Sequence, residues 1–144
     1  MNDADQHNLQ RFLDAQAGVF ASALDELKKG RKRGHWIWSI FPQLKGLGHS
    51  ANSEFYGIAG VNEAAAYLKH PVLGPRLMEC VQAVNSIEGR SAEEIFGEID
   101  AMKFRSSMTL FAHAAPEERG FRQALQKYFQ GEFDPITLSR LGEN

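Results

Sequence analysis

Residues 99–114, with the sequence IDAMKFRSSMTLFAHA, are the stretch that decides the fold. If this stretch is one helix, most of its circumference is covered by apolar side chains, which are Ile99, Met102, Phe104, Met108, Leu110 and Phe111. A helix that is apolar on so much of its surface is enclosed by other elements. We therefore expect a long helix over 99–114 inside the molecule, with its polar stripe largely buried.

The rest of the chain also has a helical pattern, because its apolar residues recur mostly every three or four positions. Ser91 and Glu94 have the spacing of a capping box at a helix start, and the residue before a proline leaves the helical conformation, so a helix must end near His70. The predicted fold class is all-α. The expected helices lie at 9–15, 16–29, 62–68, 73–87, a short stretch ending at 97, 99–114, 121–129 and 135–141.

The composition predicts a single domain over 1–144 and excludes several kinds of partner. The chain is 43% hydrophobic, and its 16 basic and 18 acidic residues give a formal net charge of −2. Such a balance lacks the field that draws a protein onto nucleic acid or anionic lipid, so we expect neither nucleic acid nor a membrane as a partner. The oligomeric state stays open.

The sequence also predicts a cytoplasmic location. Cys80 is the only cysteine, which excludes an internal disulfide and fits a reducing compartment. Residues 1–7 are polar and acidic, whereas a signal peptide is basic and then apolar. No stretch has the roughly 20 apolar residues that span a bilayer.

One segment does not follow the helical pattern. Residues 35–50, HWIWSIFPQLKGLGHS, hold both tryptophans, two closely spaced glycines and a proline. Because aromatic rings favour burial, glycine allows close backbone approach and proline fixes φ, we expect an irregular, Trp-rich, buried loop at about 35–57. The alternation within 36–41 predicts an extended piece of chain. If the loop is only a structural lock, the side chains that bond its buried backbone groups are His35, Gln43 and Ser50.

Four motifs carry a resemblance to a known family. They are His35-Trp36-x-Trp38, Phe41-Pro42-Gln43, Gly46-Leu47-Gly48-x-Ser50 and Asp100-x-x-Lys103-x-x-Ser106-Ser107. Over nearly its whole length the chain resembles the domain-of-unknown-function family numbered 1810. The resemblance implies a small, single-domain, all-α protein found mostly in bacteria, and it brings no established activity, cofactor or catalytic residue. Some fungal members carry the label calpastatin, which denotes a disordered inhibitor, whereas two Trp and 10 Phe indicate a packed globule.

The polar residues of the helix at 99–114 have two interpretations. Asp100, Lys103 and Ser107 are spaced i, i+3, i+7 and share one face. In the functional interpretation, Lys103 binds an anionic group and Asp100 orients a hydroxyl or a water molecule. In the structural one, Asp100 and Lys103 form an ion pair, which contributes only about 0.2–0.5 kcal/mol on a helix surface.

The residues of the Trp-rich loop are similarly ambiguous. His35 ionises near neutral pH, which suits a general acid or base, but it equally fits a bond to a backbone carbonyl. Trp36 and Trp38 alternate, which allows one to enter the core while the other lines a pocket, but core packing is the competing interpretation of each. The loop formed by Gly46, Gly48 and Ser50 either lets its backbone approach a phosphate or simply makes a turn.

Other polar residues have structural interpretations. The five basic residues within 28–33 lie at a predicted helix end, where cations complement the helix dipole and stay solvated. The five histidines show no i,i+4 pair, so we expect no metal site. Cys80 lies on the inward face of its helix and serves as a small core residue.

These observations predict a pocket between the Trp38–Ser50 loop and the Asp100–Ser107 helix. The predicted ligand is a phosphate-bearing molecule, such as a nucleotide or an ADP-ribose-like compound. We expect the domain to bind or hydrolyse it without a cofactor. Whether the protein is an enzyme stays open, and the alternative is a noncatalytic interaction or regulatory domain in which the same residues are structural. The predicted catalytic residues are Asp100 and His35, and the predicted ligand-binding residues are Trp36, Trp38, Gln43, Gly46, Gly48, Ser50, Lys103 and Ser107.

Overall fold

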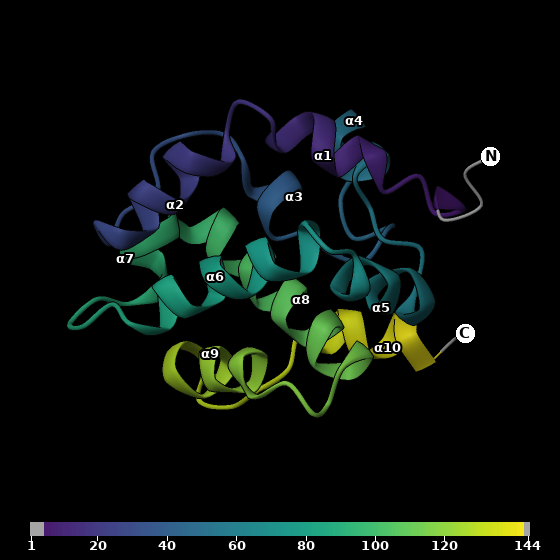
Figure 1. Ribbon diagram of the computed structural model, residues 1–144. Helices are drawn as coiled ribbons and strands as arrows, with labels where there is room; N and C mark the ends of the chain where they lie inside the picture. Colours follow the sequence, from purple (N-terminus) through teal and green to yellow (C-terminus); the bar gives the residue numbers. More distant parts are fainter. Residues whose placement is uncertain (1–4, 143–144) are drawn as a thin grey trace.

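The computed structural model describes residues 5–142, and it confirms the all-α prediction (Figure 1). Within these residues ten helices and no strand occur. The helices are α1 (Gln10–Gln16), α2 (Phe20–Lys28), α3 (Ile37–Ile40), α4 (Ala51–Phe55), α5 (Val61–Lys69), α6 (Leu73–Asn85), α7 (Ala92–Phe96), α8 (Glu98–Ala114), α9 (Arg119–Phe129) and α10 (Pro135–Gly142).

Helix α8 is the central element of the fold. In Figure 1 it lies in the middle of the molecule, and it packs against α3, α5, α7, α9 and α10. Every residue from Ser106 to Ala112 is buried, as expected for an enclosed helix. The first two turns differ from the prediction, because Ile99 is 71% exposed and Met102 is 67% exposed. The packed helices enclose the second half of α8 but leave the outer side of its start uncovered.

Two helix boundaries follow from local chemistry, as the sequence predicts. The Ser91 hydroxyl accepts a hydrogen bond from the Glu94 N–H at 3.1 Å, and the Glu94 carboxylate accepts one from the Ser91 N–H at 2.8 Å. This capping box starts α7. Helix α5 ends at Lys69, and His70 is extended, with ψ of 131°, because Pro71 follows it.

The Trp-rich segment is irregular overall, but the extended conformation predicted for residues 36–41 is wrong. Ile37–Ile40 form the single helical turn α3, and the Phe41 N–H donates to the Ile37 carbonyl at 2.9 Å. A helical turn satisfies buried backbone groups within the segment itself, whereas an isolated extended chain needs partners elsewhere. Farther along, Leu44 and Ile58 form an isolated parallel bridge that closes the loop around α4.

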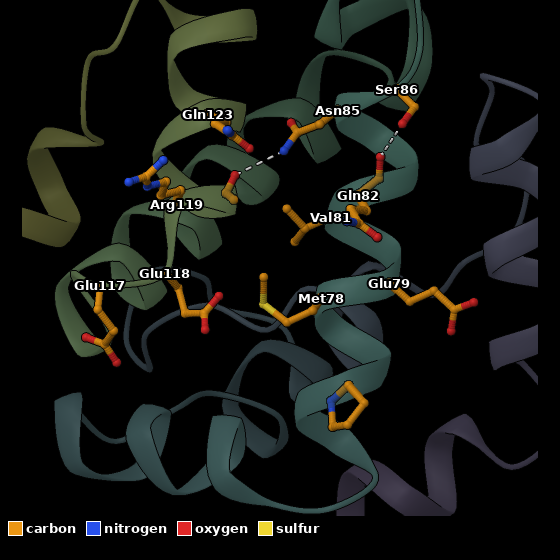
Figure 2. A pocket seen from close by; sticks show the side chains of 12 residues that line it. Met78, Glu79, Val81, Gln82, Asn85, Ser86, Glu117, Glu118, Arg119 and Gln123 are labelled. Atoms are coloured by element: carbon orange, nitrogen blue, oxygen red, sulfur yellow. Dashed lines mark hydrogen bonds between the residues drawn. The ribbon is translucent and has the colours of Figure 1, made fainter.

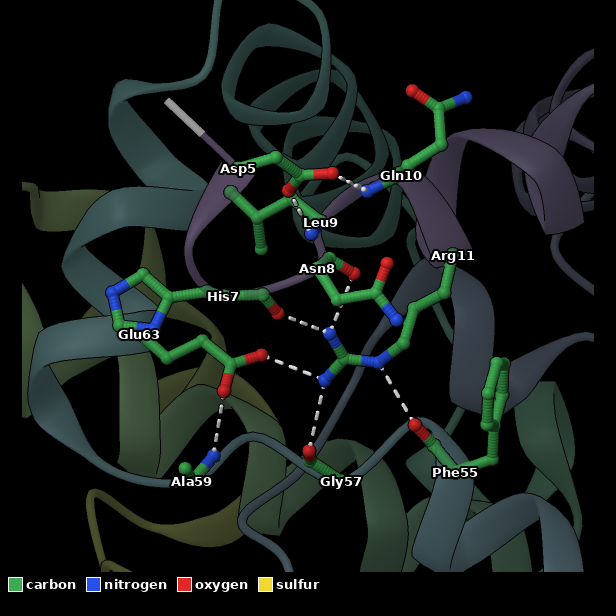
Figure 3. Close-up of polar contacts among 10 residues, drawn as sticks. All are labelled: Asp5, His7, Asn8, Leu9, Gln10, Arg11, Phe55, Gly57, Ala59 and Glu63. Atoms are coloured by element: carbon green, nitrogen blue, oxygen red, sulfur yellow. Dashed lines mark hydrogen bonds and ion pairs between the residues drawn. The ribbon is translucent and has the colours of Figure 1, made fainter. Parts of the chain in front are cut away.

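A buried arginine ties the N-terminal helix to this loop (Figure 3). The Arg11 guanidinium forms an ion pair with Glu63 at 2.7 Å, and both side chains are less than 10% exposed. Its other N–H groups donate to the carbonyls of residues 7, 8, 55 and 57 at 2.7–3.0 Å. All five N–H donors of Arg11 therefore have partners, and α1, α5 and the chain after α4 are held together.

Candidate functional site

A small pocket lies between the Trp-rich segment and α8, where the sequence predicts one. Ile37, Trp38 and Phe41 form its apolar side, and Lys103 reaches it from α8. The pocket encloses about 240 Å³ including its open mouth, but only about 10 Å³ of that space is wide enough for a water molecule. That is room for about one water molecule, whereas ligand pockets usually have about 300–1,000 Å³. The interior therefore admits a small chemical group rather than a whole nucleotide.

Most of the polar side chains around this pocket have no partner among residues 5–142; the exception is Ser53, whose hydroxyl accepts a hydrogen bond from the Ser50 hydroxyl at 3.0 Å. Trp38, Gln43, Tyr56 and Lys103 are each half-buried, and among residues 5–142 their side-chain nitrogen and oxygen atoms make no hydrogen bond or ion pair. The same is true of Asn52, which is exposed at the rim. None of these atoms is fully buried, because the buried and unpaired side-chain atoms of the described residues are Asn85 Oδ1 and Ser107 Oγ. The donors and acceptors at this hollow are therefore open to water and available to a ligand.

Short-range contacts fix the walls of the pocket. The rings of Trp38 and Tyr56 stack with their centroids 6.2 Å apart and their planes inclined by 16°. Gln43 is held by its backbone, because its carbonyl accepts a hydrogen bond from the Ile58 N–H at 2.9 Å. Lys103 lies on the second turn of α8, the helix most enclosed by the fold. The pocket is thus built on rigid parts of the chain, while its polar side-chain ends stay free.

The structure gives the loop residues Gly46, Gly48 and Ser50 structural tasks. Gly46 has a φ of +95°, which favours glycine at this turn. Gly48 lies so close to Ser53 that a Cβ atom would collide with the Ser53 side chain. The Ser50 hydroxyl caps α4 by accepting a hydrogen bond from the Ser53 N–H at 3.1 Å. None of the three lines the pocket, and their role in ligand binding stays a prediction.

Asp100 pairs with Lys32 and not with Lys103. The Lys32 Nζ lies 2.7 Å from the Asp100 Oδ2, and the two side chains are only 7% and 20% exposed. The Lys32 Nζ also donates to the Gly34 carbonyl and lies 5.0 Å from the ring centroid of Trp36. The prediction that all five basic residues of 28–33 stay solvated is therefore wrong for Lys32. The backbone N–H of Lys32 donates to the carbonyl of residue 95 at 2.7 Å, which holds this loop against the end of α7, just before α8 begins.

The two tryptophans have different environments. Trp36 is 2% exposed, and its indole N–H donates to the Glu26 carboxylate at 2.8 Å. Partial burial of the Glu26 carboxyl acts to raise its pKa. The pKa is nevertheless lower than its ordinary value, because the carboxylate accepts hydrogen bonds from the backbone N–H groups of Gly34 and Arg33 and from the indole N–H, and because Lys32 is positively charged. The structure thus places Trp36 in the core beside charged groups and Trp38 in the pocket wall.

The predicted catalytic residues are not brought to the pocket. His35 is exposed, and Asp100 is engaged by Lys32. Ser107 is fully buried one turn beyond Lys103, and its hydroxyl has no hydrogen-bond partner within the described part of the chain. Neither His35, Asp100 nor Ser107 lines the pocket, so their chemical roles stay predictions.

Sequence reasoning did not assign Asn52 and Tyr56 to the site. These residues are spaced i, i+4, so they share one face of the turn that α4 forms. That spacing is a usable signal, but only once α4 is known to exist, and the sequence shows an irregular loop there. The Lys32–Asp100 pair joins residues 68 positions apart and has no sequence signal at all.

A second, more open hollow lies between α6 and α9 (Figure 2). It has a volume of about 760 Å³, and Glu79, Glu117 and Glu118 contribute carboxylates to its lining, against one guanidinium from Arg119. This charge balance disfavours an anionic ligand. Within residues 5–142, no group of three or more His, Cys, Asp or Glu side chains could hold a metal ion.

Comparison with known proteins shows which family the chain belongs to. A family model described as a protein of unknown function (DUF1810) matches residues 6–141. The chain belongs to the DUF1810 family. This DUF1810 chain is 52% identical to the conserved hypothetical protein Rv1873 from Mycobacterium tuberculosis, and the match to its crystal structure has a TM-score of 0.93 and covers 94% of this chain and 96% of that one. Curated proteins gave no match.

The solved structure of Rv1873 confirms the fold class, and the family match confirms the resemblance. A further property of this chain comes from its own helices. Between residues 5 and 142, none of them is both long and apolar enough to cross a membrane.

Proposed function

We propose that this DUF1810 protein is a ligand-binding domain that holds the anionic group of a small, phosphate-bearing molecule, of nucleotide or ADP-ribose type, at Lys103. One observation carries the proposal: four half-buried polar side chains without partners surround a single pocket, and Lys103 is the one charged residue among its lining residues. An ammonium group beside apolar walls attracts an anion more strongly than one in open water.

The other side chains supply neutral contacts. Gln43 and Asn52 each offer an amide donor and an amide acceptor, and Trp38 and Tyr56 offer an indole N–H and a phenol hydroxyl. Apolar walls with a few convergent polar groups are typical of small-molecule sites. Because the interior has room for only about one water molecule, the anionic group lies at the mouth beside Lys103, and the rest of the ligand lies outside it.

The structure supports binding more than hydrolysis. A hydrolase at this pocket needs a general base within reach of the ligand, but Asp100 is bound by Lys32 and His35 lies outside the pocket. Proton transfer by Asp100 and His35 is a separate proposal, tested by whether any bound phosphate compound is also turned over.

The test uses thermal unfolding with a panel of nucleotides, ADP-ribose and sugar phosphates. A ligand present at ten times its Kd raises the melting temperature of a domain of this size by about 3–6 °C. In Lys103→Met, which keeps the aliphatic stem and removes the charge, we expect the fold to survive and the ligand shift to disappear. Lys69→Met, which removes a charge from an exposed position on α5, is the matched control and should keep the shift.

Two results would overturn the proposal. One is the absence of a shift with every phosphate compound in the panel. The other is a shift that Lys103→Met leaves unchanged. The first result favours the alternative, in which the Trp-rich segment is a structural lock in a noncatalytic interaction or regulatory domain. The second shows that the ligand binds elsewhere on the protein.

A further inference from the structure

We infer that the base of a bound nucleotide lies on Ile99 and Met102, an exposed apolar surface beside Lys103, so that the protein selects nucleotides over sugar phosphates. This inference rests on the proposed function and narrows its ligand class.

The two side chains are unusual in their exposure. Among residues 5–142, no other large apolar side chain is exposed as much as Ile99 and Met102. They are spaced i, i+3 on the first two turns of α8, so they are neighbours on the helix surface. A single exposed apolar residue is common on protein surfaces, so what distinguishes this pair is the group beside it.

That group is the unpaired ammonium of Lys103. Lys103 is spaced i, i+4 from Ile99, so the two share a face of α8 and lie about 5.4 Å apart along the helix axis. The sugar of a nucleotide separates its phosphate from its base by a distance of this order. A phosphate held by Lys103 at the pocket mouth therefore leaves the base within reach of Ile99 and Met102.

Three other directions from Lys103 are closed to a base. The pocket interior has room for about one water molecule. On the side of Lys103 away from Ile99 lies Asp100, which is engaged by Lys32 in a mostly buried ion pair. Farther along the shared face of α8, Ser106 is buried. The exposed start of α8 is thus an apolar surface that stays open beside the anion site.

A flat ring suits these two side chains. Methionine is flexible and polarisable, and its thioether makes favourable contacts with aromatic rings. A tenfold gain in affinity corresponds to about 1.4 kcal/mol, which the burial of about 55 Å² of apolar surface supplies. A purine ring that covers two exposed side chains of this size buries at least that much, counted on both surfaces. A sugar phosphate lacks the ring and gains only the polar contacts at the pocket mouth.

Adenosine 5′-monophosphate and ribose 5-phosphate are a matched pair of ligands, because both carry a phosphorylated ribose and only the first carries a base. Calorimetry gives the tighter Kd, and competition against the tighter ligand gives the weaker one. We expect the nucleotide to bind at least about tenfold more tightly. Lys103→Met should weaken the binding of both compounds, because both use the phosphate contact.

A double variant removes the apolar surface and keeps the helix. Ile99→Ala with Met102→Ala changes two exposed positions to the residue that most favours a helix, so stability should change little. In this variant we expect the Kd of adenosine 5′-monophosphate to rise about tenfold and that of ribose 5-phosphate to stay unchanged. Val72→Ala, at an exposed apolar residue before α6, is the matched control and should change neither Kd.

Phe55 on α4 is the competing apolar surface, because it precedes Tyr56 of the pocket wall and is also exposed. Its ring already packs edge-on against the Tyr56 ring, with the two centroids 4.8 Å apart. We therefore expect Phe55→Ala to keep the preference for the nucleotide. A preference that is lost in Phe55→Ala and kept in the double variant would place the base on α4 and overturn the inference.

The remaining outcomes separate this inference from the proposed function. If ribose 5-phosphate binds as tightly as the nucleotide and Lys103→Met weakens both, the anion site stands and the inference is wrong. The inference is also wrong if the double variant keeps the full preference. If neither compound binds, or if Lys103→Met affects neither, the proposed function fails and the inference fails with it.

Discussion

Replacing Arg11 by methionine tests the most extensive polar contact in the fold. The change removes the ion pair with Glu63 and the hydrogen bonds to four backbone carbonyls, while it keeps most of the aliphatic stem. The Glu63 carboxylate, 6% exposed, then retains the Ala59 N–H as its donor, at 3.0 Å, and loses its cation. The variant therefore leaves a buried charge uncompensated.

The expected loss is large for a domain of this size. Breaking a buried ion pair by removing one partner costs about 3–5 kcal/mol, and the whole free energy of unfolding of a domain is about 5–15 kcal/mol. At about 3 °C per kcal/mol, Arg11→Met should lower the melting temperature by about 9–15 °C. Urea unfolding followed by circular dichroism measures the same loss as a lower midpoint with an unchanged slope.

A double variant separates the charge from the packing. Arg11→Met with Glu63→Leu removes both charges, and apolar replacements of buried ion pairs are often neutral. We expect the double variant to be at least about 1 kcal/mol more stable than Arg11→Met alone. Arg31→Met, at an exposed position, should change stability by less than about 0.5 kcal/mol. A loss below about 1 kcal/mol in Arg11→Met, or a double variant as unstable as the sum of its single changes, would refute the reasoning.

Three further predictions concern other buried groups. Lys32→Met should destabilise the fold by roughly 2–3 kcal/mol, because it leaves the mostly buried Asp100 carboxylate without its cation. Lys103→Met should cost less than about 1 kcal/mol. Equal losses for the two variants in urea unfolding would contradict the ion pair between Lys32 and Asp100. The folded state lowers the pKa of Glu26 from its ordinary value of 4.5, so its contribution to stability is present above pH 4.5 and is lost as the pH falls through the lowered pKa; Glu26→Gln should therefore show a weaker fall in unfolding midpoint on acidification. Burial raises the pKa of the Cys80 thiol to about 12, so a thiol reagent at pH 8 should label it only on unfolding, and rapid labelling of the native protein would disprove its burial.

The helices illustrate how much local sequence determines. The capping box at Ser91 and the end of α5 before Pro71 are local effects, and the structure confirms both. The central position of α8 also follows from its own composition, since its apolar residues cover most of its circumference. These predictions succeed because each depends on residues within one or two helical turns.

Errors arose where the determining contact is distant in sequence. Trp36 and Trp38 predict a buried segment, but the helical turn of α3 depends on the surrounding core. Likewise, Ile99 is exposed although its side chain is apolar, because the helices packed around α8 do not cover the outer side of its first turns.

The candidate site divides in the same way. The sequence alone placed a pocket between the Trp-rich segment and α8 and selected Trp38, Gln43 and Lys103, because aromatic, amide and cationic side chains are individually recognisable. Only the tertiary structure decided which lysine is free. Lys32 and Lys103 are both cations near Asp100 in space. The fold of the chain before α3 brings Lys32 into an ion pair with Asp100, so Lys103 lies unpaired at the pocket. Ion pairing depends on distances of a few ångströms between segments far apart in sequence, and no local pattern encodes them.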